Sequence, residues 1–162
     1  MTPSTIYVTT LNVRGLIDKQ KCEKVYTWLI QQQCDIIFIQ EMHCTATNVE
    51  NLKKLWHGQS CYGVSDSPYS KGVAILFKPK LKVNITDEKS MNNGRTLMVN
   101  IEHNNTKYTL VNIYAPNRIN ERCEYYKKMK NNIESFSHNL NNLLICGDLN
   151  CSLKMTEQLR HI

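Results

Sequence analysis

The sequence predicts an α/β (α+β) domain in which helices cover either one mixed sheet or two sheets packed face to face. Three observations support this prediction. Apolar, strand-like runs alternate with amphipathic segments in the first part of the chain, alternating segments typical of an antiparallel meander follow, and a last amphipathic segment precedes a last apolar run. With 162 residues, the chain fits a single domain over residues 1–162 that is long enough to bury a core.

The first part of the chain is expected to alternate strands and helices. The β-branched segment 6–12 alternates like a strand, and the run DIIFIQ at 35–40 is apolar at every central position, as in a strand covered on both faces. Val25, Trp28 and Leu29 recur at helical spacing. The expected elements are a strand over 6–12, a helix over 19–33, a strand over 35–40 and a short helix over 49–56.

The second part is expected to be a meander of strands, followed by a helix and a closing strand. The segment EHNNTK places Asn104 and Asn105 at a hairpin tip. Apolar residues at 126, 129, 133, 136 and 140 predict a long amphipathic helix. The expected elements are strands over 62–64, 72–77, 81–87, 96–102 and 108–114, a helix over 119–140 and a strand over 143–147.

The composition excludes several classes of protein. The longest apolar runs are too short to cross a bilayer, and the N-terminus lacks the basic and apolar segments of a signal peptide. Seven cysteines without paired CxxC spacings predict neither a disulfide framework nor a zinc site. We therefore expect an intracellular protein, nuclear or cytoplasmic, with no membrane partner. The net charge of +6 fits a polyanionic partner without requiring one.

The last apolar run, LLICGDLN, ends in two polar side chains. Asp148 and Asn150 are two residues apart, so on an extended backbone they would point to the same face. The end of a central strand is a common place for chemistry in an open α/β sheet. The alternative is a polar turn in which both side chains only satisfy backbone groups.

Other predicted strands also end in oxygen-bearing side chains. These residues are Asn12, Gln40, Glu41, Asn112 and Tyr114. Pooled on one rim, such carboxylates and carboxamides would suit a hard cation such as Mg²⁺. Taken singly, each has an ordinary explanation: a turn residue, a surface charge or a half-buried packing residue.

Six blocks of the chain, in this order, resemble the endonuclease/exonuclease/phosphatase superfamily. They are LNVRGL, CDIIFIQEMH, GVAILF, GRTL, LVNIYAPN and LLICGDLN. The resemblance runs from about residue 5 to residue 153, and the branch it resembles most is the N-terminal endonuclease domain of LINE-type non-LTR retrotransposons. It implies a DNase I-like four-layer fold, a two-sheet β-sandwich flanked by helices, and hydrolysis of phosphodiesters.

The resemblance also implies roles for individual residues. Glu41 matches the principal Mg²⁺ ligand, with Mn²⁺ as an alternative ion, and Asn12 belongs to the same metal site. Tyr114 matches a tyrosine that approaches the scissile phosphate. Asp148 matches the aspartate that orients or deprotonates the attacking water, and Asn150 its neighbour that holds phosphate and water.

Three further residues are expected at the margins of this site. Arg95 resembles a basic residue that faces DNA phosphates, although an exposed surface arginine is an equal alternative. Asn117, in NIYAPN, is expected to contact DNA. His43, two residues after Glu41, is expected to support that carboxylate from behind.

The sequence departs from the family pattern after the GDLN block. The family has a later Ser-Asp-His segment that is central to catalysis, and His161 does not match it in position or context. We therefore expect the C-terminal strands of the fold to be missing, strand edges and apolar faces to be left open, and turnover to be sharply reduced.

The function expected from these observations is that of a Mg²⁺-dependent DNA endonuclease that leaves a 3′-hydroxyl. It would need no small-molecule cofactor and would be a segment of a longer polyprotein with a reverse transcriptase. One alternative is an apurinic/apyrimidinic endonuclease and 3′-exonuclease of DNA repair. The other is a non-catalytic remnant with at most weak DNA binding.

Overall fold

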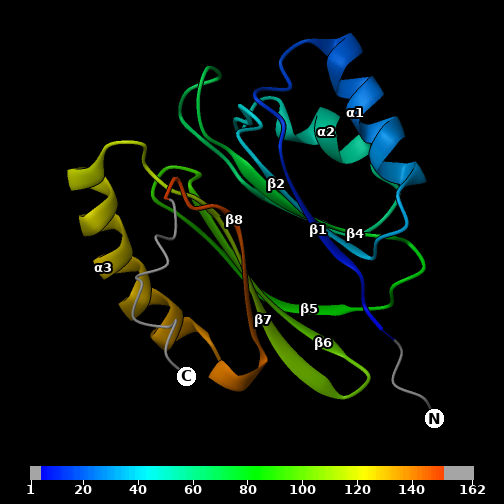
Figure 1. Cartoon of the computed structure of the whole chain (residues 1–162). Helices are drawn as coiled ribbons and strands as arrows, with labels where there is room; N and C mark the ends of the chain where they lie inside the picture. Colours follow the sequence, from blue (N-terminus) through cyan, green and yellow to red (C-terminus); the bar gives the residue numbers. More distant parts are fainter. Residues whose placement is uncertain (1–4, 152–162) are drawn as a thin grey trace, which may run out of the picture.

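The first half of the chain forms a four-stranded mixed sheet in the computed structural model, which describes residues 5–151 (Figure 1). β1 and β2 are parallel, while β4 is antiparallel to both β2 and β3. The strand order is β1-β2-β4-β3. The strands are β1 (Val8–Asn12), β2 (Ile36–Gln40), β3 (Ser60–Gly63) and β4 (Val73–Phe77), and the helices of this half are α1 (Lys19–Gln31) and α2 (Val49–Lys54).

The second half forms another four-stranded sheet, in the order β5-β6-β7-β8. β5, β6 and β7 form an antiparallel meander, and β8 returns parallel to β7. The return passes through α3 and a short 3-10 helix, η1. The elements are β5 (Asn84–Met91), β6 (Thr96–His103), β7 (Thr106–Tyr114), α3 (Ile119–Phe136), η1 (Leu140–Asn142) and β8 (Leu143–Asp148).

Side chains alternate between the two faces of each sheet, and the molecule has four layers: helices, two sheets and a further helix. In β2, Ile36 and Phe38 enter the core between the two sheets, whereas Ile37 and Ile39 pack under α1 and α2. In the second sheet, one face joins the inter-sheet core and the other packs against α3. Figure 1 shows α1 and α2 on one side and α3 on the other, with both sheets between them. The structure therefore has two sheets packed face to face rather than one mixed sheet.

Two predicted elements differ from the observed ones. The strand expected over 81–87 is shifted to Asn84–Met91, because the charged segment after Ile85 continues as an exposed edge strand, with a register shift between Ile85 and Asp87. Edge strands tolerate such charges. The helix expected to reach residue 140 ends at Phe136, where the Ser137 N–H donates to the Ile133 carbonyl at 2.8 Å. Leu140 is consequently 55% exposed instead of buried.

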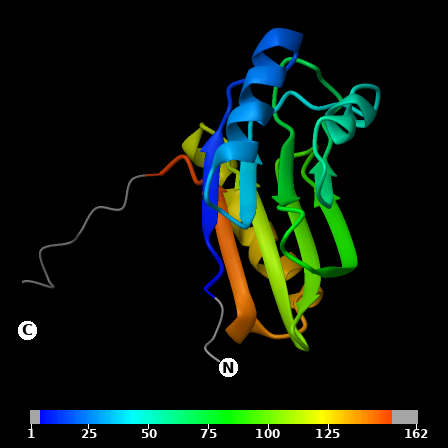
Figure 2. The same ribbon diagram turned by 90° about the vertical axis from the view of Figure 1, so that its right-hand side faces the viewer.

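The topology gathers the ends of four strands at one edge of the molecule. β1 and β8 are edge strands of different sheets and lie side by side (Figures 1 and 2). Because β1 runs parallel to β2 and β7 parallel to β8, their carboxyl ends lie together at the top of Figure 1. No helix within residues 5–151 is both long enough and apolar enough to span a membrane.

Candidate active site

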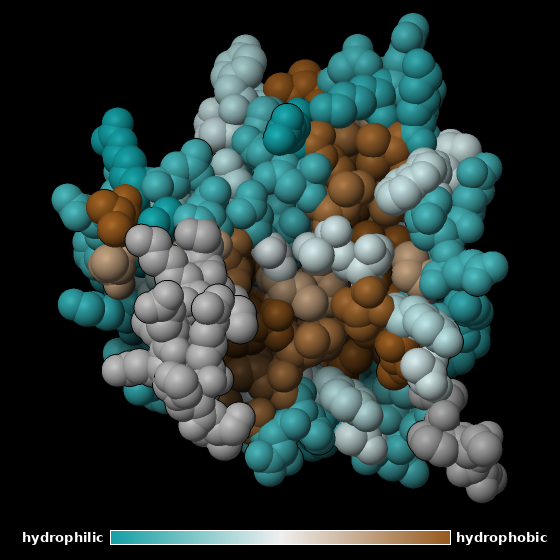
Figure 3. All heavy atoms as spheres, in the orientation of Figure 1, coloured by the Kyte–Doolittle hydropathy of each residue, from teal (hydrophilic) through white to brown (hydrophobic). Residues whose placement is uncertain are grey.

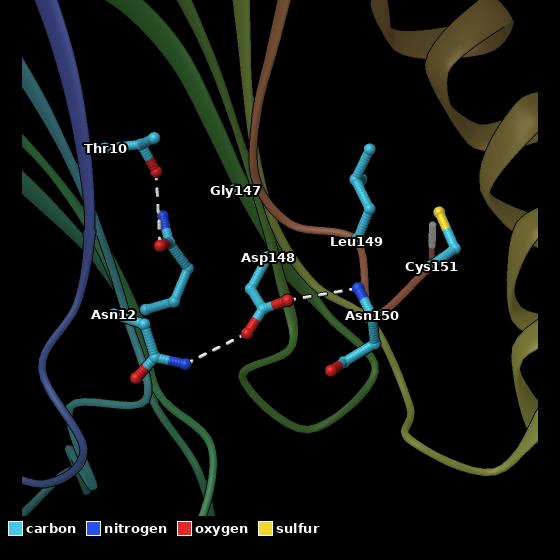
Figure 4. A pocket seen from close by; sticks show the side chains of 8 residues that line it. Thr10, Asn12, Gly147, Asp148, Leu149, Asn150 and Cys151 are labelled. Carbon is cyan, nitrogen blue, oxygen red and sulfur yellow. Dashed lines mark hydrogen bonds between the residues drawn. The ribbon is translucent and has the colours of Figure 1, made fainter. Parts of the chain in front are cut away.

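Asp148, at the end of β8, is held by hydrogen bonds on both carboxylate oxygens. Asn12 Nδ2 donates to Oδ2 at 3.0 Å, and the Asn150 N–H donates to Oδ1 at 3.0 Å. Figure 4 shows Asp148 between these two residues. The contact between Asn12 and Asp148 joins residues 136 positions apart and connects the two sheets at their edge strands. The carboxylate therefore has a fixed orientation, with its remaining lone pairs available to a water molecule.

The backbone around Asp148 takes conformations that few residues adopt. Gly147 has φ +137°, and a Cβ there would lie 2.0 Å from the Ile113 carbonyl oxygen, so only glycine fits. Asn150 has φ +47°, in the left-handed region that asparagine tolerates. Its Nδ2 donates to the Ala115 carbonyl at 2.6 Å. These features end β8 at Asp148. They turn Asp148 and Asn150 toward the edge of the molecule where the ends of β1, β2, β7 and β8 meet, which we call the rim.

A pocket of about 440 Å³ lies beside Asp148 at this rim. Asn12 and Asn150 line it with Asp148, so its wall is rich in oxygen and nitrogen atoms (Figure 4). Its other lining residues are Thr10, Gln40, Gly147, Leu149 and Cys151. Thr10, Leu149 and Cys151 carry no sequence signal of their own, and only their place next to predicted strand ends could have pointed to them.

Glu41 and Tyr114 form a second polar pair on the same rim. The Tyr114 hydroxyl donates to Glu41 Oε1 at 3.2 Å. Burial and then the Glu41 carboxylate raise the pKa of Tyr114, and the charge of Asp148 adds to this increase. The phenol therefore keeps its proton at neutral pH and acts as a hydrogen-bond donor.

The two polar pairs are held together by the backbone. Tyr114 and Asp148 are register partners in β7 and β8, and the Ala115 N–H donates to the Asp148 carbonyl at 2.9 Å. On the other sheet, the Gly15 N–H donates to the Glu41 carbonyl at 2.6 Å. Tyr114 therefore links the two pairs, because its hydroxyl bonds to Glu41 and its backbone is in register with Asp148.

Arg95 lies against Tyr114 at the start of β6. Its NH1 group donates to the Tyr114 carbonyl at 3.2 Å, and its guanidinium carbon lies 5.0 Å from the centre of the Tyr114 ring. Arg95 is half-buried, so it is an ordered part of the rim as well as a positive charge beside it.

The structure places Asn117 and His43 away from these hydrogen bonds. Asn117 is exposed just before α3, and its carbonyl accepts a hydrogen bond from Arg122 at 3.1 Å. The His43 ring packs over Gly15, where an added Cβ would lie 2.7 Å from His43 Nδ1. Among residues 5–151, no hydrogen bond joins the His43 ring to Glu41. His161 lies outside the described residues.

Gln40 and Asn112 are not exposed at their strand ends, although Gln40 also lines the pocket beside Asp148. Both are buried between the sheets, where Gln40 Nε2 donates to Asn112 Oδ1 at 2.7 Å. The physical reason is alternation: both residues share a strand face with inter-sheet core residues.

The side chains of the rim fit a hydrated magnesium ion better than a closed protein cage. Within the part of the chain that the structure describes, no three His, Cys, Asp or Glu side chains cluster as metal ligands. Glu41, Asp148 and Asn12 nevertheless supply the oxygen atoms that Mg²⁺ prefers, and this ion often takes only one or two protein carboxylates and keeps several waters.

Comparison with known proteins assigns the chain to a family. A model of the endonuclease/exonuclease/phosphatase family matches residues 9–155, and the chain belongs to this family. The chain is also 26% identical over 146 residues to a Xenopus laevis protein named "Transposon TX1 uncharacterized 149 kDa protein". This match covers 90% of the chain and 11% of that protein.

Solved structures share the fold. An endonuclease/exonuclease/phosphatase family protein from Bacteroides thetaiotaomicron has a TM-score of 0.70 at 14% identity, covering 92% of this chain and 65% of that one. The Xenopus laevis APE2 catalytic domain has a TM-score of 0.67 at 17% identity, covering 92% and 60%. A humanized Danio rerio TDP2 has a TM-score of 0.67 at 17% identity, covering 91% and 63%. The predicted family and the DNase I-like fold are therefore confirmed, and the chain spans less than two thirds of these structures.

Proposed function

We propose that the chain carries the metal-binding and water-orienting residues of a Mg²⁺-dependent DNA endonuclease that leaves a 3′-hydroxyl. The observation that supports this most directly is the Asn12–Asp148 hydrogen bond at 3.0 Å, which brings the predicted metal site and the predicted water-orienting aspartate together across two sheets. The Tyr114–Glu41 hydrogen bond at 3.2 Å adds the predicted metal ligand and a proton donor to the same rim.

In this proposal the residues divide the work of hydrolysis. Glu41, supported by Asn12, would hold Mg²⁺, which when bound would neutralise charge on the phosphate; Mn²⁺ could replace it. Asp148 would aim a water at the phosphorus and accept its proton; the bond between phosphorus and the 3′-oxygen would break, and the 3′-oxygen would take a proton from solvent water. Tyr114, once its hydroxyl turns from Glu41, and Asn150, through the Nδ2 hydrogen not bonded to Ala115, would donate hydrogen bonds to the phosphate oxygens as negative charge develops.

Duplex DNA is the proposed partner, with Arg95 and Asn117 at its phosphates and His43 supporting the Glu41 segment from behind. The match to a transposon protein of which the chain covers only 11% supports a place in a longer polyprotein. There, the 3′-hydroxyl would prime DNA synthesis by a reverse transcriptase domain of the same polyprotein.

DNA repair is the second proposal, supported by the likeness to the APE2 catalytic domain at a TM-score of 0.67. The same rim residues would then cleave beside abasic sites and remove nucleotides from 3′ ends. Cleavage of matched duplex oligonucleotides, one intact and one with a single abasic site, distinguishes the two. Faster cleavage of the abasic duplex would favour repair, and equal or faster cleavage of intact DNA favours the endonuclease.

Nicking of supercoiled plasmid tests the proposal. The resemblance implies a catalytic histidine within a Ser-Asp-His segment. The 162-residue sequence has five histidines but no Ser-Asp-His segment, so we expect slow, Mg²⁺-dependent nicking by this chain. Glu41→Gln and Asp148→Asn should each reduce the rate by about 100-fold or to background. The nicked ends should be extended by a DNA polymerase without prior treatment.

The matched control is Glu50→Gln, which removes an exposed carboxylate on α2 that pairs with Lys53. Its nicking rate should equal that of the unsubstituted chain. Nicking that survives chelation of the metal, or that Glu41→Gln and Asp148→Asn leave unchanged, would refute the proposal. If no nicking is seen, salt-dependent binding to duplex DNA in the unsubstituted chain would identify the non-catalytic binder instead.

A further inference from the structure

The chain forms a bulge at the carboxyl end of β2, where Gln40 is followed by Glu41. Ile39 is the register partner of Ala74, but Met42 N–H bonds to the Gly72 carbonyl at 2.9 Å. Two residues, Gln40 and Glu41, therefore lie between these two links on one side, whereas Val73 alone lies between them on the other. Glu41 itself has φ +57°, in the left-handed region that is unfavourable for a residue with a Cβ.

This bulge decides which way the Glu41 side chain points. In a regular strand Glu41 would follow the alternation of Ile37 and Ile39, whose side chains pack under α1 and α2. Tyr114 lies on the inter-sheet side of β7 instead. The Glu41 carboxylate can reach the Tyr114 hydroxyl at 3.2 Å because the extra residue redirects it.

Asn112 supplies the hydrogen bonds at the opening of this bulge. Its Nδ2 donates to the carbonyls of Ile39 at 2.9 Å and Ala74 at 2.7 Å, the last register pair before the bulge. Its Oδ1 accepts from Gln40 Nε2 at 2.7 Å. Both hydrogens and the oxygen of the amide are therefore bonded to neighbouring residues of β2 and β4 in the opposite sheet.

The burial of Asn112 makes these bonds costly to lose. The residue is 0% exposed, and Gln40 is 1% exposed, so water cannot replace the amide without rearrangement. Removing the amide would take one hydrogen bond from each of two buried carbonyls and leave Gln40 Nε2 without its acceptor, whereas Gln40 Oε1 would keep its bond from Thr10. This loss would fall where the backbone is already in an unfavourable conformation.

We infer that Asn112 is a positioning residue, which holds the β2 bulge and thereby directs the Glu41 carboxylate toward Tyr114 and the Asp148 rim. The inference rests on the proposed function in so far as Glu41 is to bind a metal. Its structural part, that Asn112 maintains the bulge, is independent of that function.

Asn112→Leu tests the inference, because leucine has a similar volume and no hydrogen-bonding groups. The matched control is Asn100→Leu, since Asn100 is 1% exposed in β6 and bonds to Phe136 and Thr109 on the side facing α3. Both substitutions remove a buried amide from the same sheet, but only the first one lies at the bulge.

Amide hydrogen exchange gives the first readout. In Asn112→Leu, exchange at Met42 and Gly15, whose N–H groups bond across the bulge, should accelerate at least about tenfold beyond any change in global unfolding. In Asn100→Leu these two amides should follow global unfolding only. Equal behaviour of Met42 and Gly15 in the two variants would overturn the inference.

Binding of Tb³⁺, detected by luminescence sensitised by Tyr114, gives the second readout. Tb³⁺ affinity should fall at least about tenfold in Asn112→Leu, stay unchanged in Asn100→Leu, and be lost in Glu41→Gln. If the unsubstituted chain binds no Tb³⁺, the metal role of Glu41 fails, while hydrogen exchange still decides whether Asn112 maintains the bulge. Unchanged affinity in Asn112→Leu, with binding intact in the unsubstituted chain, would contradict its positioning role.

Gln40→Met covers the case in which Asn112→Leu does not fold. It removes the donor to Asn112 Oδ1 and leaves the two bonds from Asn112 to backbone carbonyls. A smaller change in the same direction, about threefold in Met42 exchange, is expected. No change at Met42 in this folded variant would also count against the inference.

Discussion

The pKa of Tyr114 depends on several charged side chains of the rim. It donates to Glu41, carries the Arg95 guanidinium over its ring and lies in the field of Asp148. Burial raises its pKa most, the Glu41 carboxylate raises it further, and Arg95 partly opposes them.

Glu41→Gln should therefore lower the pKa of Tyr114 toward the ordinary tyrosine value, because a negative neighbour that opposes ionisation becomes neutral. Burial remains, so the pKa should stay above that of a free tyrosine. NMR titration of ring-labelled tyrosine measures this shift. The control is Glu50→Gln, because the Glu50 carboxylate pairs with Lys53 and does not contribute to the raised pKa of Tyr114. An unchanged Tyr114 pKa in Glu41→Gln would contradict the arrangement.

At the residue scale, the sequence predicted several site residues because their types and blocks are distinctive. Asn12, Glu41, Tyr114, Asp148 and Asn150 were named from strand ends and family blocks, and the structure places them on one rim. Their catalytic and metal-binding roles stay predictions. The buried pairing of Gln40 with Asn112 was not foreseen, because strand alternation assigns a face only once it is known which layers lie on each side.

At the element scale, short contacts anchor the edge of the first sheet. Asp35, just before β2, accepts a hydrogen bond from the Tyr7 N–H at 2.8 Å and pairs with Lys80 at 3.0 Å. Burial opposes its ionisation, but the Tyr7 N–H and the Lys80 ammonium outweigh burial, and the pKa of Asp35 is held below its ordinary value. This carboxylate ties the approach to β1 to the end of β4.

Asp35→Asn should destabilise the fold by about 1–2 kcal/mol at pH 7. Because the folded-state pKa is lowered, the contribution of Asp35 is present above its unfolded-state pKa and is lost as the pH falls through the folded-state value. Urea unfolding should thus show a difference between the two proteins at pH 7 that shrinks below about pH 4. A difference that is constant across this range would refute the assignment.

Most elements were predictable from periodicity, and the exceptions have local causes. Apolar strands such as 35–40 and the amphipathic start of α3 follow directly from the pattern of buried residues. β5 did not, because an exposed edge strand has no buried face to impose alternation. The bulge at the end of β2 could not be predicted from the sequence either, because no residue type marks it and Asn112, which bonds to Ile39 beside it, is 73 residues away.

At the scale of the whole molecule, the edge formed by β1 and β8 is open. Among the residues that the structure describes, each strand has a hydrogen-bonded neighbour on one side only, and Val8 and Ile145 are 39% and 43% exposed. Figure 3 shows apolar atoms reaching the surface in the middle of this face. A groove there is lined largely by apolar residues: Ile6, Val8, Ile36, Ile101, Tyr108, Leu110, Leu143 and Leu144, with Asn141 and Asn142. Within residues 5–151, this open edge and apolar groove are surfaces of a kind that favours association.

The same open edge bears on function, because the rim with Asp148 and Asn12 lies at the end of these two strands. Our proposal is that four strand ends, from both sheets, converge on one site for a hydrated divalent ion. Fold and family do not depend on this claim, whereas the proposed activity does.

The most direct test is paramagnetic broadening of backbone NMR signals by Mn²⁺, with competition by Mg²⁺. We expect selective broadening of the backbone signals of Asn12, Glu41, Tyr114 and Asp148. Excess Mg²⁺ should reverse this broadening, and Glu41→Gln should abolish it. Broadening centred on another part of the molecule, or none at millimolar Mn²⁺, would contradict the proposal.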